Sequence, residues 1–211
     1  MPARYRAALF DFDGTLADSF PLFSEAFNTL ADRHGFRRVT TAESHELRTL
    51  HPREIMKRVG MPAWKLPLVM KDFIGIMRER RRTVRPFKGV DAMLAALQRA
   101  DVALAIVSSN ERDNVTAVLG KRSSARIDHF ACGMSIFGKR RHLREALAAL
   151  EVKAKDAIYI GDQPADFEAA RAEGIAFGAV AWGYGDGKYL ASLEPDFMFR
   201  HLPEIASLAD G

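Results

Sequence analysis

The stretch Ala7-Ala8-Leu9-Phe10-Asp11-Phe12-Asp13-Gly14-Thr15 decides the fold and most of the chemistry of this 211-residue chain. Its first four residues form a short apolar run, which is typical of a buried strand in a parallel sheet. Two aspartates and a glycine follow, so the strand ends in a polar turn. Open parallel α/β sheets bind ligands at the carboxyl ends of their strands, so we expect a functional site here.

Further apolar runs repeat this pattern in the second half of the chain. Buried strands are predicted at residues 102–107, 157–160 and 175–180. Helical patterns lie between and beside them, at residues 90–99, 112–119, 141–150 and 165–173. Strands that alternate with helices predict the α/β class, with a Rossmann-like parallel sheet covered by helices on both faces.

The stretch from about residue 20 to residue 85 breaks this rhythm. It contains helical patterns at residues 22–34, 45–59 and 66–82, but no convincing strand. Turn-forming residues at 86–89 stand where the chain would return to the sheet. We therefore expect two domains, an α/β core of residues 1–16 and 86–211 and an all-helical cap of residues 17–85.

Composition and charge indicate an ordinary globular protein, since 48% of the residues are hydrophobic and 27% are charged. The formal net charge of +4 raises the question of an anionic partner. The basic residues cluster at 78–85 and 139–144, with few aromatic side chains among them on which bases could stack. We therefore expect no nucleic-acid partner.

The cysteine content and the N-terminus favour a cytoplasmic protein. Cys132 is the only cysteine, so no intramolecular disulfide can form, and a reducing compartment is the simpler assumption. The first apolar run is too short for a signal-peptide core or a membrane span, so we expect no membrane partner. The sequence leaves both a monomer and a homodimer open.

Polar clusters follow three of the predicted strands, at residues 11–15, 108–110 and 161–166. The sheet would bring them to one edge, where several carboxylates would repel one another unless a cation lay among them. Oxygen ligands without histidine or cysteine favour Mg²⁺ over zinc. The predicted metal-site residues are Asp11, Asp13, Asp162 and Asp166.

This arrangement predicts phosphoryl transfer. With Mg²⁺ neutralising the charge, Asp11 can attack phosphorus in line and form an acyl phosphate. A turn at Gly14 can bring Asp13 toward the leaving oxygen, as an acid and then as a base toward water. Positioned donors and cations stabilise the phosphoryl oxygens. The predicted phosphate-binding residues are Thr15, Ser108, Ser109 and Lys139.

These residues resemble the motifs of the haloacid dehalogenase-like hydrolase superfamily, and within it the phosphoglycolate-phosphatase-like group with a helical cap. The similarity covers nearly the whole chain. Phe10 to Ser19 resembles the first motif, Ser108 the second, Lys139 the third, and Gly161-Asp162 with Asp166 the fourth.

The resemblance implies a role for each of these positions. Asp11 would be the nucleophile and a metal ligand, and Asp13 the acid/base and a ligand through its backbone carbonyl. Asp162 would bind the metal, and Asp166 would order its waters. Thr15 would orient the loop, while Ser108 and Lys139 would hold phosphate, with Lys139 also paired to Asp11. The helical cap would close over a small phosphorylated metabolite, with phosphoglycolate as the first guess.

Two departures leave the substrate open. Ser108-Ser109-Asn110 stands where phosphoglycolate phosphatases usually have Thr-Asn-Lys, and Arg140 stands where they commonly have proline. A phosphosugar mutase of the same fold remains an alternative, as does a non-catalytic phosphate-binding or interaction protein. A dehalogenase is disfavoured, because it would need neither an acid at Asp13 nor a metal.

Two other motif interpretations fail because required positions carry the wrong residue. Residues 133–139 match most of a P-loop, but Arg140 replaces the hydroxyl that binds Mg²⁺. Residues 11–22 do not form a calcium loop, because glycine falls at the fourth position and Leu22 replaces the bidentate glutamate.

Overall fold

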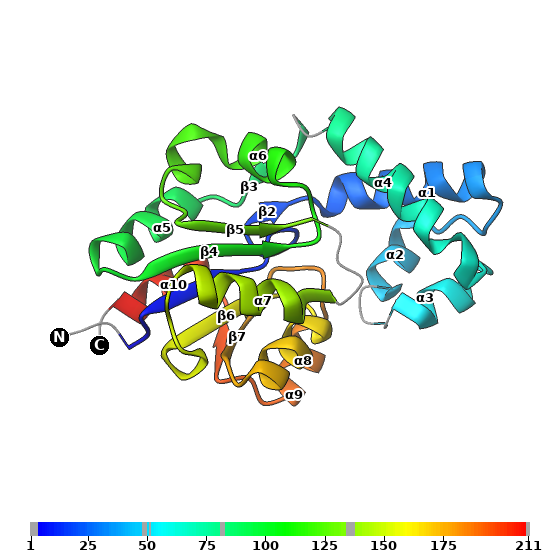
Figure 1. Ribbon diagram of the computed structural model, residues 1–211. Coiled ribbons are helices and arrows are strands. Elements are labelled where there is room, and N and C mark those ends of the chain that lie inside the picture. The colour runs from blue at the N-terminus through cyan, green and yellow to red at the C-terminus, as the bar shows by residue number, and fades with distance from the viewer. Residues whose placement is uncertain (1–3, 48–49, 51, 81–82, 134–137, 210–211) are drawn as a thin grey trace.

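Figure 1 shows the computed structural model, which describes residues 4–47, 50, 52–80, 83–133 and 138–209. Within these residues, six strands form one parallel sheet in the order β5-β4-β1-β6-β7-β8. The bounds are β1 Ala7–Phe10, β4 Ala103–Ser108, β5 His129–Cys132, β6 Ala157–Gly161, β7 Ala176–Val180 and β8 Phe197–Phe199. The four predicted strands are confirmed to within one residue, whereas the sequence analysis does not predict the edge strands β5 and β8.

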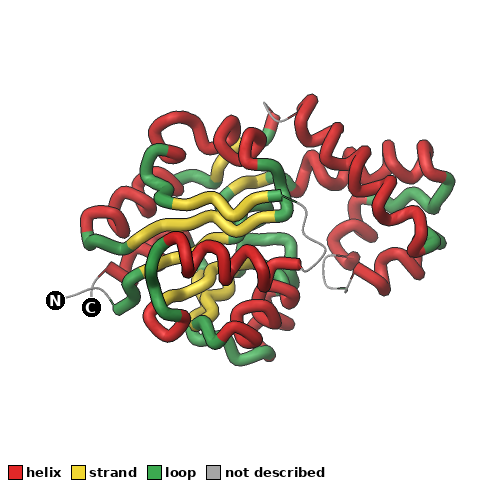
Figure 2. Tube along the Cα trace, in the orientation of Figure 1, coloured by secondary structure: helices red, strands yellow, loops and turns green. Residues whose placement is uncertain are grey.

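Helices cover both faces of the sheet, as predicted (Figure 2). Side chains alternate along β1, so Ala7 and Leu9 join one hydrophobic cluster, and Ala8 and Phe10 join the other. Helices α7, α8 and α9 pack in the first cluster, and α5, α6 and α10 in the second. Their bounds are α5 Val90–Arg99, α6 Arg112–Ser124, α7 Gly138–Ala149, α8 Pro164–Glu173, α9 Gly187–Ser192 and α10 Leu202–Ala206.

In the described part of residues 17–85, four further helices lie beyond the carboxyl ends of the strands, to the right in Figure 1. They are α1 Phe20–His34, α2 Thr41–Leu47, α3 Pro52–Arg58 and α4 Leu66–Arg80. Their buried side chains, such as Leu30 of α1, Leu47 of α2 and Val69 of α4, belong to a hydrophobic cluster separate from those of the sheet. The expectation of one helix over residues 45–59 is wrong, because α2 and α3 are separate. Proline at position 52 lacks the N–H that a continuous helix would need there.

A short ribbon joins these helices to the sheet. The two-residue strands β2 (Ala17–Asp18) and β3 (Arg85–Pro86) pair antiparallel, and Phe87 N–H donates to the Leu16 carbonyl at 2.9 Å. The chain thus leaves the sheet and returns to it at one place. We propose on this basis the division into a core of residues 1–16 and 86–211 and a cap of residues 17–85.

Candidate active site

The centre of the sheet brings two distant aspartates together. From β1 the strand order runs to β4 and β5 on one side, and β6, β7 and β8 lie on the other. The strand order therefore reverses at β1. Ligands of open α/β sheets bind where the strand order reverses, at the carboxyl ends of the strands. Asp11 follows β1 and Asp162 follows β6 there, and Asp11 N–H donates to the Ile160 carbonyl at 2.8 Å.

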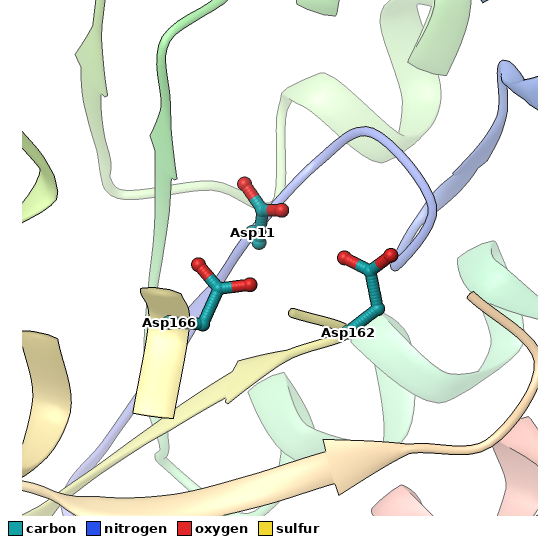
Figure 3. Close-up of side chains that lie close together, drawn as sticks. All are labelled: Asp11, Asp162 and Asp166. Carbon is teal, nitrogen blue, oxygen red and sulfur yellow. The ribbon is translucent and has the colours of Figure 1, made fainter. Parts of the chain in front are cut away.

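Asp11, Asp162 and Asp166 form a buried acidic cluster. Each offers one carboxylate oxygen, and these oxygens all lie within 4.8 Å of one another. The three residues are only 3%, 0% and 0% exposed, respectively. Figure 3 shows their side chains, which come from the ends of β1 and β6 and from the first turn of α8, facing a common space. Three of the four predicted carboxylates therefore converge.

Lys139, in the first turn of α7, supplies a positive charge to this cluster. Its Nζ lies 3.0 Å from Asp11 Oδ1 and also pairs with Asp166. Burial opposes the charged ammonium, but Asp11 and Asp166 outweigh this effect and raise the pKa of Lys139. Lys139 is therefore a cation at neutral pH, placed to attract a phosphoryl group as well as the carboxylates.

One ammonium does not balance three carboxylates. Burial raises the pKa of Asp162 to about 7, and the Asp166 carboxylate adds to the effect. Burial also raises the pKa of Asp11 well above its ordinary value, with Lys139 opposing the shift and Asp166 and Asp162 increasing it. A cluster of oxygen donors with excess negative charge fits a hard divalent cation such as Mg²⁺.

Asp166 is fixed from several sides. Tyr159 Oη donates to its Oδ1 at 2.9 Å, and Gln163 N–H donates to its Oδ2 at 3.0 Å. Gly161 leaves the space that Asp166 fills, since a Cβ at position 161 would lie 2.7 Å from Asp166 Cγ. The glycine before Asp162 is therefore required by the packing of the acidic cluster.

Asp13 lies beside this cluster, with its carboxyl group held by two donors. Ser19 Oγ donates to Oδ1 at 2.7 Å, and Asn110 Nδ2 donates to Oδ2 at 3.1 Å. Burial raises the pKa of Asp13, while both of these hydrogen bonds oppose the shift. This shift brings the pKa of the carboxyl group closer to neutral pH, where general acids and bases are most effective.

The loop after β1 is shaped by its contact with Asp162. Gly14 has a left-handed φ of 85°, and a Cβ there would lie 2.9 Å from Asp162 Cγ. Thr15 is fully buried, and its Oγ1 donates to Asp162 Oδ1 at 3.2 Å. Trp182 Nε1 donates to the Thr15 carbonyl at 3.1 Å. These contacts support the expected role of Thr15 in orienting the loop, and its contact with phosphate stays a prediction.

The two serines at the carboxyl end of β4, Ser108 and Ser109, differ in burial. Ser108 is 1% exposed, and its Oγ accepts the Asn110 N–H at 3.0 Å. This oxygen serves as the acceptor, so the hydroxyl proton can be donated to a phosphoryl oxygen. Ser109 is exposed. Ser108 is thus the better placed of the two serines predicted to bind phosphate, and both contacts stay predictions.

Several residues that hold the site give little or no signal in the sequence. Tyr159 contacts Asp166 from within β6, where an apolar run gives no signal of a polar role. Asn110, which has no predicted role of its own, donates to Asp13. Tyr184 N–H donates to Asp162 Oδ2 at 2.6 Å. The only signal for Tyr184 is the likeness of Trp182-Gly183-Tyr184-Gly185 to a segment of phosphoglycolate phosphatases.

The rejected P-loop falls on residues 133–139, of which 134–137 lie outside the described residues. Its lysine, Lys139, lies in a helix and contacts Asp11 and Asp166.

Comparison with known proteins gives consistent results in sequence and in structure. The family model described as haloacid dehalogenase-like hydrolase matches residues 8–180. Phosphoglycolate phosphatase from Synechococcus elongatus is 31% identical over 196 residues, which cover 92% of each chain. Phosphoglycolate phosphatase from Mesorhizobium japonicum is 28% identical, over 93% of this chain and 91% of that protein.

Solved structures share the fold over nearly their whole length. CbbY from Rhodobacter sphaeroides in complex with phosphate has a TM-score of 0.77 and 22% identity, with 98% of this chain and 100% of that chain covered. A haloacid dehalogenase-like hydrolase from Streptococcus pneumoniae has a TM-score of 0.81 and 20% identity, with 97% and 98% covered.

Proposed function

Since this chain belongs to the haloacid dehalogenase-like hydrolase family, we propose that it is a Mg²⁺-dependent phosphatase that works through a phosphorylated Asp11. The observation that carries the proposal is the pairing of Lys139 with Asp11 beside two further buried carboxylates, at the switch point of the sheet. The carboxyl ends of the strands thus hold an acidic cluster, the ammonium group of Lys139 and a serine hydroxyl. This combination suits phosphoryl transfer, in which positioning and charge stabilisation supply most of the catalysis.

Asp11 performs the first transfer. One of its carboxylate oxygens forms a bond to phosphorus as the bond from phosphorus to the ester oxygen breaks. Asp13 donates a proton to that leaving oxygen, and an alcohol departs. In the second transfer Asp13, now ionised, takes a proton from water, whose oxygen attacks phosphorus. Inorganic phosphate leaves, and Asp11 is restored as a carboxylate.

Mg²⁺ would be held by the carboxylates of Asp11 and Asp162 and by the backbone carbonyl of Asp13, with Asp166 ordering its waters. When bound, the metal supplies positive charge that reduces the repulsion between Asp11 and the phosphoryl group. Lys139 and Ser108 bind the phosphoryl oxygens, with Ser109 and Thr15 as further candidates. The excess negative charge of the buried cluster supports this assignment.

The substrate we propose is a small phosphorylated metabolite, with phosphoglycolate as the first compound to test. Two curated relatives that span nearly the whole chain carry the name phosphoglycolate phosphatase. Residues 17–85 act as a cap, which excludes water from the site and contributes to specificity. The cytoplasm is the proposed location, and the protein acts as a monomer or a homodimer.

We propose no nucleic-acid or membrane partner. Arginines of both basic clusters are paired with acids: Arg78 with Glu111, Arg80 with Glu25, and Arg140 and Arg144 with Glu173. These pairs leave less unbalanced positive charge for a phosphate backbone. None of the described helices has the length and the apolar character that crossing a membrane requires.

The test is a panel of phosphate esters assayed with Mg²⁺ and after chelation, and ranked by kcat/KM. We expect hydrolysis of small alkyl phosphates, phosphoglycolate among them, that is lost on chelation and restored by Mg²⁺. Product analysis separates hydrolysis from a mutase, which would return the phosphoryl group to a sugar. Binding of phosphate esters without turnover would contradict the proposal and favour a non-catalytic role.

A further inference from the structure

Tyr184 lies in the loop after β7 and contacts the active site through its backbone. Its N–H donates to Asp162 Oδ2 at 2.6 Å, and Gly185 N–H donates to the Asp162 carbonyl at 3.1 Å. Gly183 leaves no room for a side chain, since a Cβ there would lie 2.7 Å from Asp162 Cγ. The loop is therefore held tightly against the end of β6, and the position of the Tyr184 ring is defined.

The hydroxyl of Tyr184 continues a hydrogen-bonded chain to the proposed acid/base. Tyr184 Oη is hydrogen-bonded to Ser19 Oγ, and Ser19 Oγ donates to Asp13 Oδ1 at 2.7 Å. A serine hydroxyl has a single proton. Because Ser19 gives that proton to Asp13, Tyr184 must be the donor to Ser19. The direction of the chain is thus Tyr184 to Ser19 to Asp13.

The ring of Tyr184 packs on the first helix of the proposed cap. Its centroid lies 5.4 Å from that of Phe20 and 6.0 Å from that of Phe23, both in α1. Ser19 is the residue that precedes α1. Tyr184 therefore connects three parts of the molecule: Asp162 at the end of β6, the start of α1 and, through Ser19, the carboxyl group of Asp13.

We propose that Tyr184 is a positioning residue for general acid catalysis. Tyr184 orients the Asp13 carboxyl group through Ser19 and links that orientation to the position of α1. This inference rests on the proposed phosphatase function. Without the tyrosine hydroxyl, the Ser19 hydroxyl loses its donor and can turn away from Asp13. The carboxyl group then delivers its proton to the leaving oxygen less efficiently, while the ring contacts with Phe20 and Phe23 persist.

The test compares esters whose leaving groups need a proton to different degrees. An alkoxide needs protonation as it departs, whereas dinitrophenolate leaves without it. For Tyr184→Phe we expect kcat/KM to fall about tenfold for phosphoglycolate, or for the best alkyl phosphate of the panel, and little for dinitrophenyl phosphate. Tyr189→Phe is the matched control, because Tyr189 is 48% exposed, and it should change neither value.

Ser19→Ala and the double variant complete the experiment. Because Tyr184 acts through Ser19, the losses for the alkyl ester should not add, and the double variant should resemble Ser19→Ala alone. Equal losses for both esters, or additive losses in the double variant, would overturn the inference. A wild-type protein that hydrolyses neither ester would instead contradict the proposed function, so the two failures are distinguishable.

Discussion

Lys139 Nζ lies 3.0 Å from Asp11 Oδ1, which joins the proposed phosphate-binding cation to the proposed nucleophile. The same ammonium pairs with Asp166, so the residue that follows β1 meets residues of α7 and α8. One positive charge faces three buried carboxylates there, and the remaining negative charge explains why the site suits a divalent cation.

Lys139→Met should lower kcat/KM for phosphate esters by about a hundredfold or more, because it removes a positive charge from the phosphoryl oxygens in a buried site. Steady-state kinetics at saturating Mg²⁺ measure the loss. Lys155→Met is the control, since Lys155 is exposed in the turn before β6, at the opposite end of that strand. Near-wild-type kinetics for Lys139→Met would remove this lysine from the mechanism.

The titration of Asp162 should make the metal-free protein less stable as the pH rises from about 4 to about 7. Asp162 has a folded-state pKa of about 7 against an ordinary value of 3.8, so the folded state binds more protons in this window. The free energy of unfolding must then fall with rising pH, by an amount on the order of 3 kcal/mol.

Urea unfolding of chelated wild type and Asp162→Asn across this window checks that effect. The variant should lack this part of the pH dependence, and Mg²⁺ should flatten the wild-type curve by favouring the ionised carboxylates. Parallel curves for the two chelated proteins would show that the Asp162 carboxylate carries no such penalty.

Glu173→Gln should destabilise the protein at pH 7 by about 1 kcal/mol, because Glu173 ties α8 to Arg140 and Arg144 of α7 while those arginines are largely exposed. Hydrogen bonding by Arg144 lowers the pKa of Glu173 below 4.5. The stabilisation is therefore present above the unfolded-state pKa and is lost as the pH falls through the folded-state value.

Chemical unfolding at pH 7 and at about pH 3 measures the difference in free energy of unfolding between wild type and Glu173→Gln. This difference should shrink at the lower pH. Glu168→Gln, at an exposed position of the same helix, serves as the control. A difference that is unchanged by acid would mean that Glu173 acts through packing and not through its charge.

Gly161→Ala should raise the Mg²⁺ concentration needed for activity about tenfold to a hundredfold. The new Cβ would lie 2.7 Å from Asp166 Cγ, so the carboxylate must move away from its donors. Gly75→Ala, within α4, is the control, because a Cβ there meets nothing within 4 Å. Wild-type Mg²⁺ dependence in Gly161→Ala would show that the position of Asp166 is unimportant to the metal.

The central strands could be predicted from the sequence because a parallel sheet buries both faces. The run at residues 7–10 is apolar throughout, and all four residues are at most 1% exposed. The edge strands give weaker signals. Strand β8 has three residues, and β5 is only partly buried at three of its four positions, so neither forms a long apolar run.

The acidic cluster could be anticipated because the strands are parallel, which places Asp11 and Asp162 at the same edge of the sheet. Contacts that depend on the conformation of loops could not be anticipated from the sequence. The hydrogen bond between Ser19 and Tyr184 joins residues 165 positions apart, and no local periodicity encodes it. The carboxyl group of Asp13 likewise turns toward Ser19 and Asn110, a choice made by the tertiary structure.

Phosphorylation of Asp11 can be detected directly by mass spectrometry of the protein quenched in acid during turnover of dinitrophenyl phosphate with Mg²⁺. In Asp13→Asn, which lacks the base for the second step, the peptide containing Asp11 should gain the mass of one phosphoryl group, and Asp11→Asn should gain none. Turnover that proceeds without a phosphoryl group on this peptide, or that persists in Asp11→Asn at the wild-type rate, would contradict the account.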